Sequence, residues 1–136
     1  MTKIRIRQAA ELLGVSDDTV RRWIDDGTLT AEQDAAGRKV VDGAQLARFA
    51  RDVHSGTGPR DPLTIGSSAR NRFVGLVTEV KSDPVMSQVH LQCGPFAVVS
   101  LMSTEAVREL GLEPGSIAVA VVKATTVIVE TPKGTQ

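Results

Sequence analysis

The chain has 136 residues with one cysteine, and its sixteen basic residues balance its sixteen acidic ones. This length suits one domain or two very small ones, and a balanced charge does not by itself indicate a nucleic-acid partner. The single cysteine excludes an intramolecular disulfide. The sequence also shows no signal-peptide pattern and no apolar run near the ~20 residues that cross a bilayer. Together with the single cysteine, these features predict a cytoplasmic protein without a membrane partner.

The first half of the chain is predicted to be helical and to contain a helix-turn-helix. A short helix ends at Gly14, and Ser16 or Asp17 caps a second helix that runs to about Asp26. Apolar residues at helical spacing are the expected core of both helices. They are Ala9, Leu12 and Leu13 in the first helix and Val20, Trp23 and Ile24 in the second.

A β-wing and a third helix are expected to follow. Residues 30–41 contain a turn at Gly37 between two short extended pieces, and Asp42 can cap a helix whose core face carries Leu46 and Phe49. The order of helix, turn, helix and wing predicts a small DNA-binding domain over residues 1–53.

The outward face of the second helix is the expected DNA-reading surface. Arginines there can contact guanine edges, each worth ~1–3 kcal/mol of discrimination, and a basic wing tip can contact phosphate or the minor groove. The alternative for the arginine pair on this helix is a solvated face without DNA contact. The candidate DNA-contacting residues are Ser16, Asp18, Thr19, Arg21, Arg22, Arg38 and Lys39.

These residues also carry a family resemblance. Residues 6–16 and 19–23, followed by Gly27-Thr28-Leu29 and the pair Arg38-Lys39, resemble the DNA-binding domain of MerR and excisionase-type regulators. The resemblance covers roughly residues 3–52 and implies binding to double-stranded DNA. Because the helical core is small, useful affinity is expected to require a dimer.

A flexible linker is expected over residues 54–66, where Gly, Pro and polar residues lack periodicity. The second half then alternates in hydrophobicity, which predicts strands over residues 73–80, 85–91, 96–101, 117–122 and 127–129. One short helix over residues 104–110 is expected to be capped by Ser103 and ended by Gly111. The fold class is therefore α+β, a winged helix-turn-helix domain followed by an OB-like five-stranded β-barrel over residues 67–132.

Two short segments at the ends of this barrel carry the most informative chemistry. Ser68-Ala69-Arg70-Asn71 and Lys123-Ala124-Thr125 each combine one cation with small or hydroxyl residues beside an apolar strand. If the fold brings them together, they can supply the charge-assisted hydrogen bonds that a tetrahedral oxyanion needs. The alternative for Lys123 is an ion pair with Glu79 or Glu130.

The second half resembles the molbindin (Mop, or TOBE) domains, which bind molybdate and tungstate. The resemblance spans roughly residues 67–130 and includes the Arg-Glu-Leu-Gly-Leu stretch at residues 108–112. It implies oxyanion sites between subunits, so the two ligand segments are expected to come from different copies of a homo-oligomer, from a dimer up to a hexamer. The implied molybdate-binding residues are Ser68, Ala69, Arg70, Ser103, Lys123, Ala124 and Thr125.

Two departures limit what the resemblance implies. Ala106 stands where the family often has serine, so one hydroxyl donor is missing. Ser103 stands where the family usually has threonine, and the alternative to ligand contact for its hydroxyl is a purely structural role as a helix cap.

The leading functional hypothesis is a molybdate-responsive or tungstate-responsive transcriptional regulator with the oxyanion as its bound ligand. The alternatives are a molybdate storage protein and an oligomeric, excisionase-like DNA-binding protein without a ligand. An enzyme is not expected, because no carboxylate or Asn completes a triad with His90 and Cys93, which would point to opposite faces of one strand. A metal site is not expected either, since one cysteine and two histidines are too few for the usual four ligands.

Overall fold

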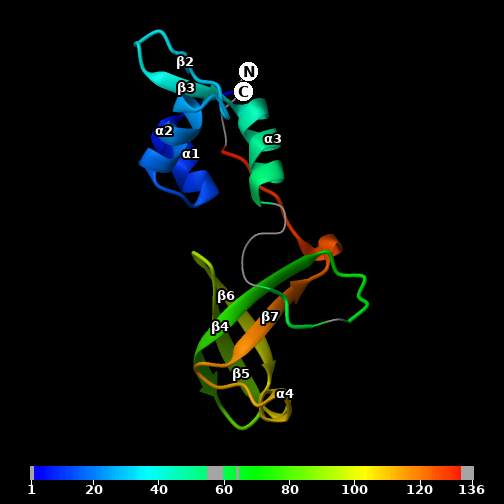
Figure 1. Ribbon diagram of the computed structural model, residues 1–136. Helices are drawn as coiled ribbons and strands as arrows, with labels where there is room; N and C mark the ends of the chain where they lie inside the picture. The colour runs from blue at the N-terminus through cyan, green and yellow to red at the C-terminus, as the bar shows by residue number, and fades with distance from the viewer. Residues whose placement is uncertain (1, 55–59, 64, 133–136) are drawn as a thin grey trace. The chain divides into compact units, whose positions relative to one another are not determined.

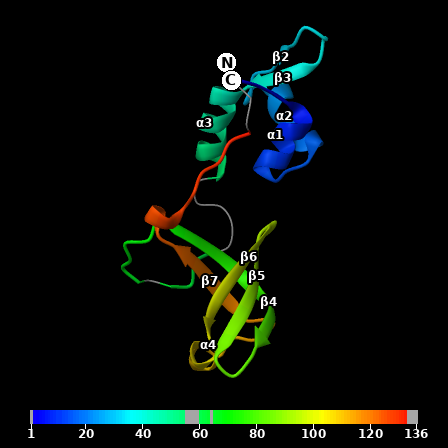
Figure 2. The same ribbon diagram turned by 180° about the vertical axis from the view of Figure 1, so that it is seen from behind.

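The computed structural model describes residues 2–54, 60–63 and 65–132, which form two compact units, Met1–Gly58 and Pro59–Gln136 (Figures 1 and 2). Each unit is described by itself. Among the described residues, no helix is long and apolar enough to span a membrane. The first unit contains β1 (Lys3–Arg5), α1 (Ile6–Leu13), α2 (Asp17–Asp25), β2 (Glu32–Gln33), β3 (Lys39–Asp42) and α3 (Gly43–His54).

The predicted helix boundaries in this unit are confirmed by their caps. Gly14 ends α1 in the left-handed region with φ of 69°, which glycine adopts at little steric cost. The hydroxyl of Ser16 accepts a hydrogen bond from the backbone N–H of Thr19 at 3.1 Å and so begins α2. The carboxylate of Asp42 accepts from the N–H of Gln45 at 3.2 Å at the start of α3.

The core of the first unit matches the predicted apolar faces except at one position. Leu12 is 63% exposed, whereas Ile6, Ala9 and Ala10 are buried. The prediction for Leu12 was wrong because the buried face of α1 follows positions i, i+3, i+4 and i+7 from Ile6, which leaves residue 12 outside it. The remaining members of the core are Val20, Leu29, Val41 and Leu46, with Trp23, Ile24 and Phe49 packed against them.

A three-stranded sheet of order β1-β3-β2 forms the wing. Sequence reasoning expected the β2–β3 hairpin with its turn at Gly37 but missed β1, which pairs antiparallel with β3 and aligns Arg5 with Val40. Lys3 of β1 makes ion pairs with Glu32 of β2 and Asp42 of β3, and these contacts raise the pKa of its amine.

The second unit is a curled antiparallel sheet of order β6-β5-β4-β7 with one short helix at its end (Figure 1). The helix α4 begins at the cap Ser103 and ends at Gly111, as predicted. The elements are β4 (Asn71–Ser82), β5 (Met86–Cys93), β6 (Phe96–Ser103), α4 (Thr104–Leu110), β7 (Ile117–Val122) and the 3-10 turn η1 (Ala124–Thr126).

The predicted five-stranded barrel is corrected to a four-stranded half-barrel. Residues 127–129 were expected to form the fifth strand, but they follow η1 as an irregular segment, with Ile128 and Val129 84% exposed. A β-branched run becomes a strand only when a neighbouring strand accepts its backbone hydrogen bonds, and no described residue pairs with this one. In the single chain, β6 and β7 therefore remain the two edges of an open sheet.

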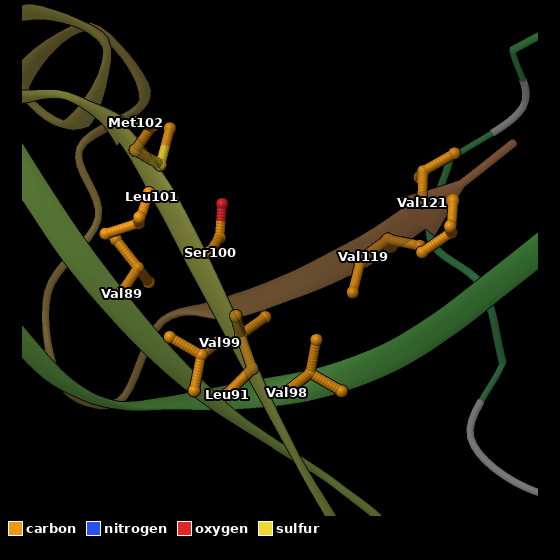
Figure 3. A pocket seen from close by; sticks show the side chains of 11 residues that line it. Val89, Leu91, Val98, Val99, Ser100, Leu101, Met102, Val119 and Val121 are labelled. Atoms are coloured by element: carbon orange, nitrogen blue, oxygen red, sulfur yellow. The ribbon is translucent and has the colours of Figure 1, made fainter. Parts of the chain in front are cut away.

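The open curl leaves an apolar hollow of about 420 Å³ between β6 and β7. Figure 3 shows Val99 and Leu101 of β6 and Val119 and Val121 of β7 around it. The core of this unit lies between the sheet and α4 and consists of Val77, Val89, Leu91, Cys93 and Val107.

The predicted linker falls partly outside the described residues, which omit residues 55–59 and 64. His54 is the last residue of α3. Further along, the Arg72 Nε donates to the Asp61 Oδ2 at 2.7 Å, and this contact holds the pKa of the Asp61 carboxyl below its usual range. Asp61, ten residues before β4, is therefore attached to the second unit.

Candidate functional site

The two predicted oxyanion segments lie at the same end of one pair of strands. β4 and β7 are antiparallel, and their ladder ends at the pair Asn71 and Val122. The amide of Asn71 donates to the carbonyl of Val122 at 3.1 Å and closes this end. Arg70 directly precedes Asn71 and Lys123 directly follows Val122, so in a single chain both cations lie beyond the same end of the ladder.

The resemblance led to the expectation that the two segments come from different copies of the chain, and within one chain they lie at the same end of the β4–β7 ladder. The family resemblance did not indicate which residues of the two strands lie opposite each other. The β4–β7 ladder has six consecutive pairs and ends with Asn71 opposite Val122. Register within a sheet fixes which residues lie opposite each other.

Arg70 and Lys123 are both exposed and have no acidic partner in the described parts of the chain. The alternative of an ion pair for Lys123 is not realised, since Glu79 instead lies 3.3 Å from Lys81. Two adjacent like charges without a counter-ion raise the free energy of the site. An anion with several oxygens would offset this cost by accepting from both side chains.

The backbone around these cations offers further donors. In η1, Thr126 donates to the carbonyl of Lys123 and Val127 donates to that of Ala124, which leaves the N–H groups of Ala124 and Thr125 without an acceptor inside the turn. Ser68 is exposed and lies three residues before the start of β4.

Ala69 fits its predicted role less directly. It is buried, and its N–H donates to the hydroxyl of Ser67 at 3.1 Å. That N–H would have to exchange its partner to reach a ligand.

Ser103 lies at the opposite end of β4. It pairs with Met86 in the β5–β6 ladder, and Met86 neighbours the Ser82–Ser87 pair that ends the β4–β5 ladder. The twelve residues of β4 separate the two ends by roughly 40 Å along the strand, at about 3.3 Å per residue. Ser103 therefore cannot contact the same anion as Arg70 and Lys123 of its own chain.

The hydroxyl of Ser103 also has a structural role, because it accepts from the N–H of Ala106 at 3.1 Å and caps α4. The adjacent hydroxyl of Thr104 is buried and bonds both the Ser87 hydroxyl, at 2.8 Å, and the carbonyl of Asp83, at 2.7 Å. The cap is thus fastened to the β4–β5 hairpin.

The predicted DNA-contacting residues lie on two elements of the first unit. Arg21 and Arg22 are exposed on α2, and Arg38 and Lys39 lie at the wing. Ser16 and Thr19 form the cap of α2, with their hydroxyl oxygens 2.9 Å apart. Asp18 is exposed in the first turn of α2.

Two cations that sequence reasoning missed join this surface. Arg5 ends β1 and Arg7 lies in the first turn of α1, and both border a hollow together with Arg21, Arg38 and Lys39. The alternation of basic and apolar residues over 3–7 was the available signal, but it could not identify the β1–β3 pairing that brings Arg5 to the wing.

The described parts of both units offer no candidate metal site. The structure places no group of three or more His, Cys, Asp or Glu residues close enough to hold a metal ion within its described ranges. On β5 the buried positions alternate, so Cys93 is buried while His90 lies on the other face, as its spacing predicted.

Comparison with known protein families identifies both units. Residues 4–53 match a helix-turn-helix domain and residues 67–129 match the TOBE domain. The chain is 43% identical over 63 residues to a probable molybdenum-pterin-binding protein of Haemophilus influenzae, which covers 46% of this chain and 91% of that protein. Both matched domains belong to binding families, in agreement with the prediction that the chain is not an enzyme.

Two further similarities cover only the second half. The molybdenum transport protein ModE of Herbaspirillum seropedicae is 34% identical over 70 residues, which are 51% of this chain but only 26% of that protein. A solved structure of the cytoplasmic molybdate-binding protein ModG with molybdate bound is 38% identical, covers 51% of this chain and 50% of that one, and has a TM-score of 0.49. The chain thus joins an N-terminal helix-turn-helix domain to a TOBE domain and belongs, through the latter, to the family of the molybdenum-pterin-binding proteins.

Proposed function

We propose that this protein is a molybdate-responsive, DNA-binding regulator of transcription that acts in the cytoplasm. The observation that carries the proposal is the adjacent, unpartnered pair Arg70 and Lys123 at one end of a TOBE domain, on a chain that also carries a helix-turn-helix domain. An oxyanion sensor joined to a DNA-binding domain has few uses other than ligand-dependent control of DNA binding. The similarity to ModE and to a cytoplasmic molybdate-binding protein supports the ligand and the compartment.

The proposed ligand is molybdate or tungstate, whose radii are nearly the same. Both are larger than sulfate, so a pocket with fixed donors can reject sulfate by size. The proposed ligands from one chain are the hydroxyl of Ser68, the backbone at Ala69, the side chains of Arg70 and Lys123, and the donors of Ala124 and Thr125.

A second copy of the chain completes this site in our proposal. Ser103 is separated from Arg70 and Lys123 by the length of β4, so it can reach their anion only from another subunit. The cap of α4, fastened by Thr104, would hold its hydroxyl in place. Ligand binding is then linked to the arrangement of subunits, as a switch requires.

Exposed apolar side chains support the homo-oligomer. Phe96, Leu101 and Ile117 are each 71% exposed on the half-barrel, and Ile128 and Val129, after η1, are 84% exposed. Large exposed apolar side chains on a folded domain are typical of a protein interface.

Calorimetric titration with molybdate tests the ligand, with sulfate and phosphate as controls. We expect binding at micromolar concentration or tighter for molybdate and none for sulfate. DNA selection with the same protein then tests the regulator. Molybdate binding without binding to any duplex would instead favour a storage protein, and duplex binding without an oxyanion would favour an excisionase-like protein.

A further inference from the structure

Five cations from separate parts of the first unit border one hollow. Arg5 ends β1, Arg7 begins α1, Arg21 lies on α2, and Arg38 and Lys39 belong to the wing. Ile6 is the one other lining residue, and the hollow has a volume of about 430 Å³. No acidic residue lines it, although the chain as a whole is neutral.

Four of these five cations make no ion pair in the described ranges. Arg7 is the one member with an ion pair in the described ranges, at 3.8 Å from Glu11 one helical turn away, and both side chains are more than 70% exposed. Such an exposed pair contributes little, because water screens the attraction between the two charges. Lys3, on the same strand as Arg5, instead binds two carboxylates. The acidic groups of this sheet therefore neutralise Lys3 and leave the hollow positive.

The backbone that carries the cluster is well fixed. Arg5 is held by its alignment with Val40 in the β1–β3 ladder. The wing turn is closed by Asp34, whose carboxylate accepts from the N–H groups of Ala36 and Arg38, both at 2.9 Å. Folding thus concentrates five positive charges, of which Arg7 alone has a described and exposed ion pair. Such an arrangement costs free energy and indicates an anionic ligand.

We propose that this hollow is a phosphate-binding cleft that receives the DNA backbone between α2 and the wing. The proposal rests on the DNA-binding function proposed above. Planar guanidinium groups bind phosphate oxygens in bidentate fashion, and contacts to phosphate position a protein without reading sequence. Arg5, Arg7 and Arg21 then supply sequence-independent affinity, and Arg21 is not a base reader. Arg22, which does not line the cleft, remains the candidate for base recognition.

The salt dependence of DNA binding tests this assignment. In our account Arg5→Ala/Arg7→Ala removes two phosphate contacts, so the slope of log affinity against log salt concentration falls by roughly two. Affinity falls roughly tenfold or more, and by the same factor for a selected duplex and for a duplex of mixed sequence. The matched control is Arg48→Ala/Arg51→Ala, which removes two exposed charges from α3 outside the cleft and should leave the slope unchanged.

The outcomes separate this inference from the proposed function. A wild-type protein that binds no duplex would overturn both. A second outcome would overturn the cleft alone. In it, the wild type binds DNA, but the salt slope of Arg5→Ala/Arg7→Ala equals that of the wild type or falls only as much as in the α3 control. Arg21→Ala is expected to weaken both duplexes equally. A selective loss for the selected duplex would make Arg21 a base reader, contrary to the proposal.

Discussion

The two units of this chain differ in how far they bury their large apolar side chains. The first unit encloses its core, with the rings of Trp23 and Phe49 packed edge to face at 4.8 Å between centroids, and presents charged groups outside. The second leaves large apolar side chains such as Phe96 exposed beside its open sheet edges. The first unit is therefore expected to fold by itself, whereas the second is expected to be complete only in an assembly.

Leu29→Ala is expected to have the largest effect and to break only the first unit. Leu29 is 1% exposed, and truncating a buried leucine costs about 2–5 kcal/mol. Trp23 is the only tryptophan of the chain, so its fluorescence reports the unfolding of the first unit alone. DNA binding should weaken sharply while calorimetry with molybdate stays unchanged. Loss of molybdate binding in this variant would show that the units are not independent.

Gly75→Ala is expected to destabilise the second unit, because it adds a side-chain atom where there is no space for one. An added Cβ would lie 2.5 Å from the sulfur of Cys93 and 2.9 Å from the backbone oxygen of Gln92. Overpacking of this kind costs about 1–3 kcal/mol. Molybdate binding should weaken, with the Trp23 transition unchanged. Gly66→Ala, where the added atom meets nothing within 4 Å, is the matched control and should behave as wild type.

Ile117→Glu sharpens the comparison by testing whether the exposed apolar surface is an interface. Residue 117 is largely exposed in the single chain, so a charge there should not unfold the sheet. In an oligomer it would place a carboxylate in an apolar contact, which is costly unless the charge is paired. Sedimentation should therefore show dissociation to a smaller species with unchanged circular dichroism. An unchanged mass would exclude this face from the interface.

The smallest effect is expected from Asp83 at the β4–β5 turn. Its carboxylate accepts from the N–H groups of Met86 and Val85, both at 2.7 Å, and these bonds lower its pKa. A lowered folded-state pKa stabilises the fold above the unfolded value of about 4, and this stabilisation is lost as the pH falls through the folded pKa. The difference in melting temperature between wild type and Asp83→Ala should be present at neutral pH and shrink in acid. A difference independent of pH would contradict this account.

Local sequence signals predicted those features of the fold that depend on neighbouring residues. Capping residues and helical periodicity identified α2, α3 and α4, and strand alternation placed β7 at its observed bounds. What failed depended on pairing between distant segments. The strand expected at residues 127–129 has no partner in the single chain, and β1 exists only because β3 lies beside it.

For the candidate site, too, local residue types could be read from the sequence, whereas pairing between distant segments could not. Residue types alone identified Arg70 and Lys123 as cations beside hydroxyl groups, and the ladder that makes them neighbours within one chain became visible only in the structure. The separation of Ser103 from them also follows from register, as does the placement of Arg5 beside the wing.

The most direct test of the central claim compares DNA affinity with and without molybdate for wild type, Lys123→Ala and Lys81→Ala. Lys81 is an exposed lysine of β4 that contacts Glu79 and lies far from Lys123 along the sheet, so it serves as the matched control. We expect molybdate to change the affinity of wild type and Lys81→Ala. Lys123→Ala should keep its affinity without ligand and lose the response. A wild-type response in Lys123→Ala would contradict the account.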